Sequence, residues 1–276
     1  DLTLQLDESG IRSFSPSCHM AERDYSAIRQ STSTHVAEFL AQHISLDEAV
    51  NHAVQMLDKA CSPLIYGLSR SSTGGQRAAC RLADRLGATI DTTASTCHAP
   101  SILALQRVGE VTSTLGEIKN RSDLIIYWGS NPLRDHPRHY SRIVESAGQF
   151  VPRGRCDRHV VVIATSPSDT SARADTFLCI EPGSDFEILW TLRAIVQGQR
   201  VTETSVGGVS VESLKMLAGQ MVSARYGAVF FGLGLTDGNC GHHNVEALLQ
   251  LVTELNYRTR FVARRMRVSG DVTGAD

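Results

Sequence analysis

Short, strongly apolar runs alternate with amphipathic segments from Pro63 onward, and this alternation constrains the fold more than any other feature of the chain. The clearest runs cover residues 64–68, 123–128 and 159–164. A strand buried on both faces reads as a continuous apolar run, and parallel strands need a crossover that is usually a helix. The pattern therefore predicts an α/β fold, with a mostly parallel sheet flanked by helices. Further strands are expected at 88–90, 176–180 and 228–232, and helices at 76–86, 139–147, 186–196, 212–222 and 242–255.

The first residues predict a small β-rich segment instead. Leucines alternate with polar residues over 2–7, and the turn signal at 8–10 indicates an antiparallel hairpin. A helix is expected over 46–60, because Ser45 and Glu48 have the spacing of a capping box. We therefore predict three regions: a β-rich segment with a helix over 1–60, an α/β domain over 61–200, and a second α/β lobe over 201–276 that is incomplete at its C-terminal end.

Composition excludes several classes of function. The 276 residues include 27 Lys and Arg against 29 Asp and Glu, a net charge of −2, and 6% aromatic residues. Because there is no basic surplus for a phosphate backbone and few rings for stacking on bases, no nucleic-acid partner is expected. No apolar run approaches the roughly 20 residues that cross a bilayer, and the first residues do not resemble a signal peptide. We therefore expect a cytoplasmic protein that does not bind a membrane.

The seven cysteines include no Cys-x-x-Cys pair. This spacing excludes a zinc ribbon or a local iron–sulfur motif within these residues, and it favours a reduced protein with mostly buried thiols. Cys61 and Cys179 are expected in the core, because Cys61 ends a predicted helix and Cys179 lies inside a predicted strand. Cys97, in a loop after a strand, is expected to be partly accessible.

Four loops are candidates for a ligand site, because open parallel sheets bind ligands beyond the carboxyl ends of their strands. These loops cover 69–75, 91–101, 129–139 and 165–175. In the third loop, Gly129-Ser130-Asn131-Pro132 directly follows a buried strand. Backbone N–H groups in such a loop suit a nucleotide diphosphate. A plain turn uses the same residue types and is the alternative interpretation.

Two further pairs of side chains could carry chemistry. Cys97 and His98 are adjacent in a strand-to-helix loop. A thiolate metal ligand beside an acid–base residue is one interpretation, and an inert thiol is the other. His136 and His139 have a spacing of three residues that would suit a metal, but two neighbouring arginines would repel a cation. A polar helix start is therefore favoured at that position.

The combination of these motifs resembles the B subunit of formylmethanofuran dehydrogenase, in the molybdopterin oxidoreductase superfamily, and its bacterial relative in the formyltransferase/hydrolase complex. The motifs are Cys97-His98-Ala99-Pro100-Ser101, Trp128-Gly129-Ser130-Asn131-Pro132 and His136-Pro137-Arg138-His139. The resemblance covers most of the chain. It implies a molybdopterin-oxidoreductase-like fold and a role in methanofuran- or tetrahydromethanopterin-linked C1 metabolism. It also implies that the partners are the other subunits of one of these complexes.

The resemblance further implies roles for single residues. Cys97 would be the ligand of molybdenum or tungsten, His98 would lie at the catalytic centre, and Arg267 is our choice for a further catalytic residue. The Gly129–Asn131 loop, together with His136, would hold the guanine dinucleotide arm of the pterin cofactor. The implied chemistry is the interconversion of CO2 and a formyl group that is passed to a C1-carrier amine.

Two departures from the family pattern favour a subunit without its metal. The iron–sulfur cysteine motif of the dehydrogenase is not visible in this sequence. Ala164-Thr165-Ser166 stands where relatives that bind the dinucleotide carry Asp-Pro-Arg. Loss of that carboxylate removes an acceptor for a guanine amine, a contact worth on the order of 1–3 kcal/mol. The leading prediction is therefore a scaffold subunit of the formyltransferase/hydrolase complex with no bound cofactor. The alternatives are an active subunit with molybdopterin guanine dinucleotide and molybdenum or tungsten, and a thiamine- or nucleotide-binding domain that shares only the fold.

Overall fold

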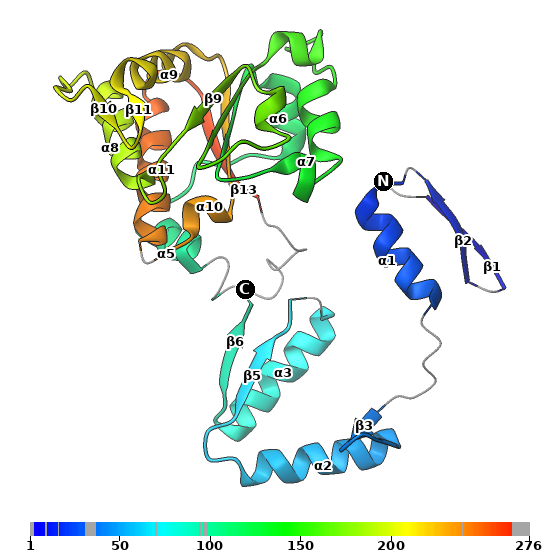
Figure 1. The fold of residues 1–276 in the computed structure, drawn as a ribbon. Coiled ribbons are helices and arrows are strands. Elements are labelled where there is room, and N and C mark those ends of the chain that lie inside the picture. Colours follow the sequence, from blue (N-terminus) through cyan, green and yellow to red (C-terminus); the bar gives the residue numbers. More distant parts are fainter. Residues whose placement is uncertain are drawn as a thin grey trace. The chain divides into compact units, whose positions relative to one another are not determined.

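The computed structural model describes residues 3–8, 10–15, 17–30, 37–69, 71–93, 95, 99–238 and 240–266. The chain divides into two compact units. One unit comprises Asp1–Gly67 and Ser71–Asp91, and the other comprises Leu68–Arg70 and Thr92–Asp276. Figure 1 shows the elements of both units.

A five-stranded parallel sheet forms the centre of the second unit (Figure 1). Its strand order is β13-β12-β7-β8-β9, and each neighbouring pair is parallel. The strands are β7 (Leu124–Trp128), β8 (His159–Ala164), β9 (Thr176–Cys179), β12 (Gly227–Phe231) and β13 (Phe261–Arg265). Every residue of β7 and β12 is buried, which is typical of parallel strands covered on both faces. The predicted parallel α/β sheet is thus confirmed.

Alternate side chains of β7 enter two different hydrophobic cores, because successive residues of a strand point to opposite faces of a sheet. Ile126 and Trp128 belong to the larger core, which includes buried residues of four helices of ten or more residues. Those helices are α5 (Ala99–Val108), α8 (Asp185–Val196), α9 (Val211–Ser223) and α11 (Gly241–Leu255). Ile125 and Tyr127 belong to the smaller core, with α6 (Leu115–Arg121) and the π-helical turn η1 (Tyr140–Glu145). Figure 1 draws α8, α9 and α11 on one side of the sheet and α6 on the other.

The remaining short elements of the second unit connect these strands and helices. They are α7 (Pro132–Asp135), α10 (Leu233–Thr236), η2 (Gly154–Asp157), η3 (Ser171–Arg173), and the paired strands β10 (Ser205–Val206) and β11 (Val209–Ser210). The predicted helix over 139–147 is present only as the turn η1, whereas β8 has the predicted bounds. No helix among the described residues has both the length and the apolar character needed to cross a membrane.

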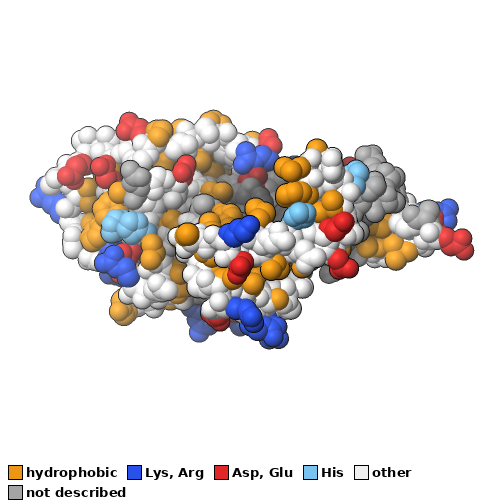
Figure 2. Space-filling model, turned by 90° about the horizontal axis from the view of Figure 1, so that it is seen from below, with side chains coloured by type: hydrophobic (Ala, Val, Ile, Leu, Met, Phe, Trp, Pro, Cys, Tyr) orange, Lys and Arg blue, Asp and Glu red, His pale blue; other side chains and the backbone are white. Residues whose placement is uncertain are grey.

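The first unit consists of small pieces with little core of their own. Its elements are β1 (Thr3–Asp7), β2 (Gly10–Ser15), α1 (His19–Gln30), β3 (Ala37–Phe39), β4 (Gln42–Ile44), α2 (Leu46–Lys59), β5 (Leu64–Gly67), α3 (Thr73–Leu86) and β6 (Thr89–Thr92). The predicted hairpin of β1 and β2 and the predicted Ser45–Glu48 capping box are both confirmed. Among its described hydrophobic residues, Ala83 alone is buried. Hydrophobic side chains also lie open on the face of the molecule shown in Figure 2.

The structure places β5 and β6 outside the main sheet. They form a two-stranded sheet of their own, whereas the sequence pattern predicts that they join β7 and β8. In the main sheet, β7 is paired with β8 on one edge and with β12 on the other. The predicted division of the chain at residues 60 and 200 stays a prediction. β12 and β13, from the predicted second lobe over 201–276, complete the same sheet as β7.

The expectation of mostly buried cysteines is wrong. Five of the cysteines that the structure describes are exposed, and Cys18 is half-buried. Cys179 ends β9, which is an edge strand and therefore has a neighbour on one side only. Cys61 follows the end of α2, a helix that has no buried residue. Both were expected in the core, and both are exposed.

Candidate functional site

Three loops at the carboxyl ends of neighbouring strands surround a pocket of about 580 Å³ in the second unit. The loops follow β7, β8 and β12, which are adjacent or next but one in the sheet. The lining is formed by Gly129, Ser130, Asn131, Arg134, Asp135, His136, Ile163, Ala164, Thr165, Ser166, Pro167, Ser168, Asp169, Ile180, Asp185, Gly232, Leu233, Gly234 and Met266. This is the edge at which open parallel sheets bind their ligands, as the sequence pattern predicts for the loops after β7 and β8.

Glycines let the loops after β7 and β12 pack backbone against backbone. The Gly232 N–H donates to the Trp128 carbonyl at 3.0 Å, and the Gly234 N–H donates to the Gly129 carbonyl at 3.0 Å. A Cβ on Gly129 would lie 2.6 Å from the Leu235 nitrogen, and a Cβ on Gly232 would lie 2.6 Å from the Gly129 oxygen. Gly129 also has φ of +58°, in the left-handed region that favours glycine. Glycine is therefore needed at these positions for the two loops to pack together in the pocket wall.

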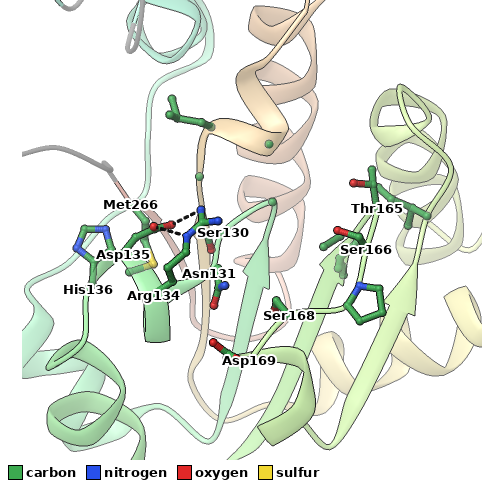
Figure 3. Close-up of a pocket in the computed structure, with 18 of the residues that line it drawn as sticks. Ser130, Asn131, Arg134, Asp135, His136, Thr165, Ser166, Ser168, Asp169 and Met266 are labelled. Atoms are coloured by element: carbon green, nitrogen blue, oxygen red, sulfur yellow. Dashed lines mark hydrogen bonds and ion pairs between the residues drawn. The ribbon is translucent and has the colours of Figure 1, made fainter. Parts of the chain in front are cut away.

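Ser130 provides a buried hydroxyl with an unused hydrogen-bonding capacity. Its Oγ atom is buried and has no hydrogen-bond partner among the described residues. Buried polar atoms without a partner are rare, and each costs free energy, so they often mark the position of a ligand or an ordered water. Ser130 lies in the pocket wall next to the glycine contact (Figure 3). The hydroxyl is therefore available to a polar ligand atom.

Asp185 brings a buried carboxylate to the same pocket. Only 6% of the residue is exposed, and its Oδ1 accepts a hydrogen bond of 2.7 Å from the Trp128 indole Nε1. Burial raises the pKa of the Asp185 carboxyl above its ordinary value, and the bond from Trp128 opposes that rise. The carboxylate lines the pocket together with Ala164, at the end of β8. The pocket thus contains an acidic acceptor although residue 164 itself has none.

The side walls of the pocket are polar. In Figure 3, Arg134, Asp135, His136 and Met266 lie on one side of Ser130, and Thr165 lies with Ser166 on the other. Arg134 donates from Nε to Asp135 Oδ1 at 2.7 Å and from Nη2 to Oδ2 at 3.1 Å. Because this pair is two-pronged and lies at the pocket wall, it presents both an acidic and a basic group to a ligand.

The structure brings together four of the predicted site residues and leaves three outside its described part. Gly129, Ser130, Asn131 and His136 all line the pocket, and their role in binding a cofactor stays a prediction. Cys97, His98 and Arg267 lie outside the described residues, so the prediction that the Cys97 loop shares this cleft stays a prediction. No cluster of three or more His, Cys, Asp or Glu side chains that suits a metal occurs among the residues described.

His139 does not join His136 as a metal pair. It packs edge-on against the Phe230 ring, and its Nε2 lies 3.0 Å from the Tyr127 hydroxyl. Burial, with a smaller effect of His136, lowers the pKa of His139 to about 4. The imidazole is therefore neutral near pH 7. His139 lies at the start of η1, as the alternative to a metal pair predicts, but it packs against the Tyr127 and Phe230 rings and is not part of a polar surface.

Sequence reasoning missed two parts of the site. Asp185 follows a Pro-Gly-Ser turn, and the sequence pattern predicts that it caps the helix over 186–196. In the structure the N-cap is Ser184, and the Asp185 side chain accepts a hydrogen bond from Trp128. The Gly232-Leu233-Gly234 segment follows the apolar run of β12 directly. Glycines immediately after a buried strand were the available signal, the same one that identified Gly129.

Comparisons with known proteins agree with this architecture. The sequence model of the molybdopterin oxidoreductase family matches residues 46–262. The chain is 39% identical, over 232 residues, to the B subunit of the tungsten-containing formylmethanofuran dehydrogenase 2 of Methanocaldococcus jannaschii, covering 84% of this chain and 53% of the relative. It is 27% identical, over 220 residues, to the B subunit of the formyltransferase/hydrolase complex of Methylorubrum extorquens, covering 79% of this chain and 56% of that protein.

Solved structures show the same fold. The crystal structure of the formyltransferase/hydrolase complex of Methylorubrum extorquens with methylofuran matches with a TM-score of 0.66 at 25% identity, covering 81% of this chain and 58% of the matched chain. Acetylene hydratase of Pelobacter acetylenicus matches with a TM-score of 0.67 at 12% identity, covering 92% of this chain and 41% of that chain, which is a likeness of fold. The chain spans about half the length of the curated relatives that it matches. Since the family model covers most of the sequence, this chain belongs to the molybdopterin oxidoreductase family.

Proposed function

We propose that this chain belongs to the pterin-carrying subunit of a formylmethanofuran dehydrogenase-type complex, and that its pocket holds the guanine nucleotide end of molybdopterin guanine dinucleotide. Its partners would then be the other subunits of such a complex. The identity of 39% to a tungsten-containing relative supports this assignment, since it exceeds the identity of 27% to the formyltransferase/hydrolase relative. When bound, the cofactor and its molybdenum or tungsten would supply the two-electron chemistry that links CO2 to a formyl group.

The residues of the pocket fit a nucleotide diphosphate. Gly129 and Gly232 line the pocket without side chains, and their close packing holds the loops after β7 and β12 together in its wall. The unpartnered Ser130 hydroxyl and the Asn131 amide are donors in the same wall, and they suit phosphate or carbonyl oxygens. Side chains of the pocket wall thus supply hydrogen-bond donors, which an anionic ligand requires.

The observation that carries the proposal is the Asp185 carboxylate. Ala164 leaves the end of β8 without the carboxylate that dinucleotide-binding relatives have, which is the main physical argument against a bound cofactor. Asp185 lines the same pocket from the start of α8, buried and oriented by Trp128. A carboxylate accepts hydrogen bonds from the N–H groups of a guanine edge, each good two-pronged contact being worth about 1–3 kcal/mol. We therefore assign that role to Asp185.

A second candidate keeps the fold and loses the cofactor. In that case the chain is a scaffold subunit of a formyltransferase/hydrolase-type complex, and its partner subunits carry out the chemistry. The match to the crystal structure of that complex, with a TM-score of 0.66, favours this candidate. Both candidates place the chain in C1 metabolism, and they differ in whether the pocket is filled.

The two candidates predict different metal contents. The complex would be purified from its native host with its partner subunits, as wild type and as Asp185→Asn. The matched control is Glu187→Gln, an exposed carboxylate in the same turn of α8 that does not line the pocket. We expect stoichiometric molybdenum or tungsten in the wild type and the control. Asp185→Asn should retain about 10-fold less, the equivalent of one lost charged hydrogen bond. An intact wild-type complex without either metal supports the scaffold and contradicts our proposal.

A further inference from the structure

We infer that Thr170 is a positioning residue of this pocket: its hydroxyl fixes the Asn131 amide so that its N–H groups, and not its oxygen, face the ligand. This inference rests on the proposed nucleotide pocket. Thr170 is fully buried, and it is not among the residues that line the pocket. Any effect of Thr170 on a ligand is therefore indirect, through Asn131 or through Ser168 and Asp169 of its own loop, which line the pocket.

One hydroxyl joins the loop after β8 to the loop after β7. Thr170 Oγ1 donates to Asn131 Oδ1 at 2.6 Å, and the same Oγ1 accepts from the Leu133 N–H at 3.3 Å. Asn131 is the N-cap residue of α7, yet its side chain makes no capping bond to its own helix. Thr170 thus performs the capping of α7 from the neighbouring loop, and this leaves Asn131 free for another task.

The geometry identifies which end of the Asn131 amide faces Thr170. A separation of 2.6 Å is ordinary for an O–H···O bond and short for an N–H···O bond, so the atom facing Thr170 is the amide oxygen. The Leu133 N–H already donates to the Thr170 oxygen, which directs the single hydroxyl hydrogen toward Asn131. The two N–H groups on Nδ2 therefore remain, and no described residue accepts from them.

The loop that carries Thr170 is itself held in one shape. The Ser168 N–H donates to Ser171 Oγ at 2.7 Å, and the Ser171 N–H donates to Ser168 Oγ at 3.2 Å. This reciprocal pair closes the turn around Thr170 before η3 begins. A buried hydroxyl in a closed turn has few other positions, so the orientation of Asn131 is set before any ligand arrives.

The fixed amide defines the class of ligand atom that Asn131 takes. Two N–H donors suit oxygens of a phosphate or a carbonyl, and they do not suit a cation. A free amide could turn by 180° and present its oxygen, which would repel the same phosphate. Loss of the Thr170 hydroxyl should therefore weaken an anionic ligand, because part of the population would have the wrong end of the amide in the pocket.

The test uses the full chain, with GDP as the probe. GDP affinity would be measured for wild type, Thr170→Val, Thr170→Ser and the control Thr253→Val, which removes a part-buried hydroxyl on α11. We expect Thr170→Val to bind GDP about 2-fold more weakly, because only about half of its Asn131 amides would then present their N–H groups, and the serine variant and the control to bind as the wild type does. In NMR spectra, the Asn131 side-chain N–H signals should shift with GDP in the wild type.

The outcomes distinguish the role of Thr170 from the proposed nucleotide pocket. Equal GDP affinity of wild type and Thr170→Val overturns the role of Thr170 and leaves the nucleotide pocket standing. A serine variant that is folded and as weak as the valine variant also overturns it, since serine keeps the hydroxyl. If the folded wild type does not bind GDP, the proposed nucleotide pocket fails and this inference with it. If Thr170→Val does not fold, the comparison of the serine variant with wild type and the NMR shift of Asn131 carry the test.

Discussion

The Trp128 indole donates a hydrogen bond of 2.7 Å to the Asp185 carboxylate and thereby joins the last residue of β7 to the first residue of α8. Trp128 is fully buried, and it belongs to the core beneath the pocket. The bond fixes the position of one carboxylate oxygen. It also stabilises the charged form of Asp185, which burial disfavours. A group that is retained against its own desolvation is characteristic of a functional site.

Replacing Asp185 by Asn should separate stability from ligand binding. Burial raises the pKa of the Asp185 carboxyl, so the charged form costs stability at neutral pH, and the neutral amide removes that cost. The amide oxygen still accepts from Trp128. We expect Asp185→Asn to be as stable as the cofactor-free wild type or more stable by about 1 kcal/mol in urea unfolding at pH 7. The difference should shrink as the pH is lowered and the wild-type carboxyl becomes protonated. A clear loss of stability would show that Asp185 has a structural role instead.

His139 should make the free energy of unfolding decrease as the pH falls below about 6.5. Its pKa in the folded chain is about 4, below the ordinary value of 6.5, so the unfolded state binds its proton first as the pH falls. Stability should therefore decrease from about pH 6.5 downward and level off near pH 4, by up to about 3 kcal/mol. His139→Gln can still bond to Tyr127 and does not titrate, so this part of the pH dependence should disappear. The control His243→Gln, at a more accessible position on α11, should retain it.

Gly129 should not tolerate a methyl group. A Cβ there would lie 2.6 Å from the Leu235 nitrogen and 2.8 Å from the Gly234 carbonyl carbon, both of them backbone atoms that cannot turn away. We expect the free energy of unfolding of Gly129→Ala to be about 3 kcal/mol lower than that of the wild type, because overpacking adds to an unfavourable left-handed φ. Gly198→Ala is the matched control, because Gly198 also has a positive φ but nothing within 4 Å of the added atom. It should lose about 1 kcal/mol. Equal losses in the two variants would contradict the close contact between the β7 and β12 loops.

Substitution of Arg158, which does not line the pocket, should strongly lower the free energy of unfolding. Its guanidinium donates to the carbonyls of Val144, Ser146 and Lys119 at 2.6–2.7 Å, and the residue is 3% exposed. Arg158→Met would leave three carbonyls without this donor, with an expected loss of about 3–5 kcal/mol in thermal or urea unfolding. The control Arg225→Met removes a guanidinium that pairs with Asp123 but is 68% exposed, and it should lose less than about 1 kcal/mol.

The parallel sheet could be predicted because its strands carry their own signal. β7, β8 and β12 are apolar along most of their length, since both faces are covered, and the residue after each is Gly or Thr. The sequence pattern did not predict β13, because its last two residues, Arg264 and Arg265, end the apolar run after Phe261, Val262 and Ala263. The separate pairing of β5 and β6 was not predicted either, because the pairing of strands is a property of the whole fold.

The same limit explains the site. Gly129, Ser130 and Asn131 were predictable because they are local to one strand end. Asp185 and Thr170 act across the sheet, on Trp128 and Asn131, at separations of 57 and 39 residues. Their roles depend on tertiary contacts that no spacing in the sequence indicates. A carboxylate at a helix start is predicted to be a helix cap, and only the fold shows that its partner is Trp128.

A guanine nucleotide in the pocket is tested most directly by the GMP content of the complex purified from its native host with its partner subunits. Acid hydrolysis of a pterin guanine dinucleotide releases GMP, which can be quantified beside molybdenum and tungsten. We expect GMP in stoichiometric amount with one of these metals, and a clear reduction of both in Asp185→Asn but not in Glu187→Gln. An intact wild-type complex that releases no GMP and contains neither metal would contradict the proposed pocket.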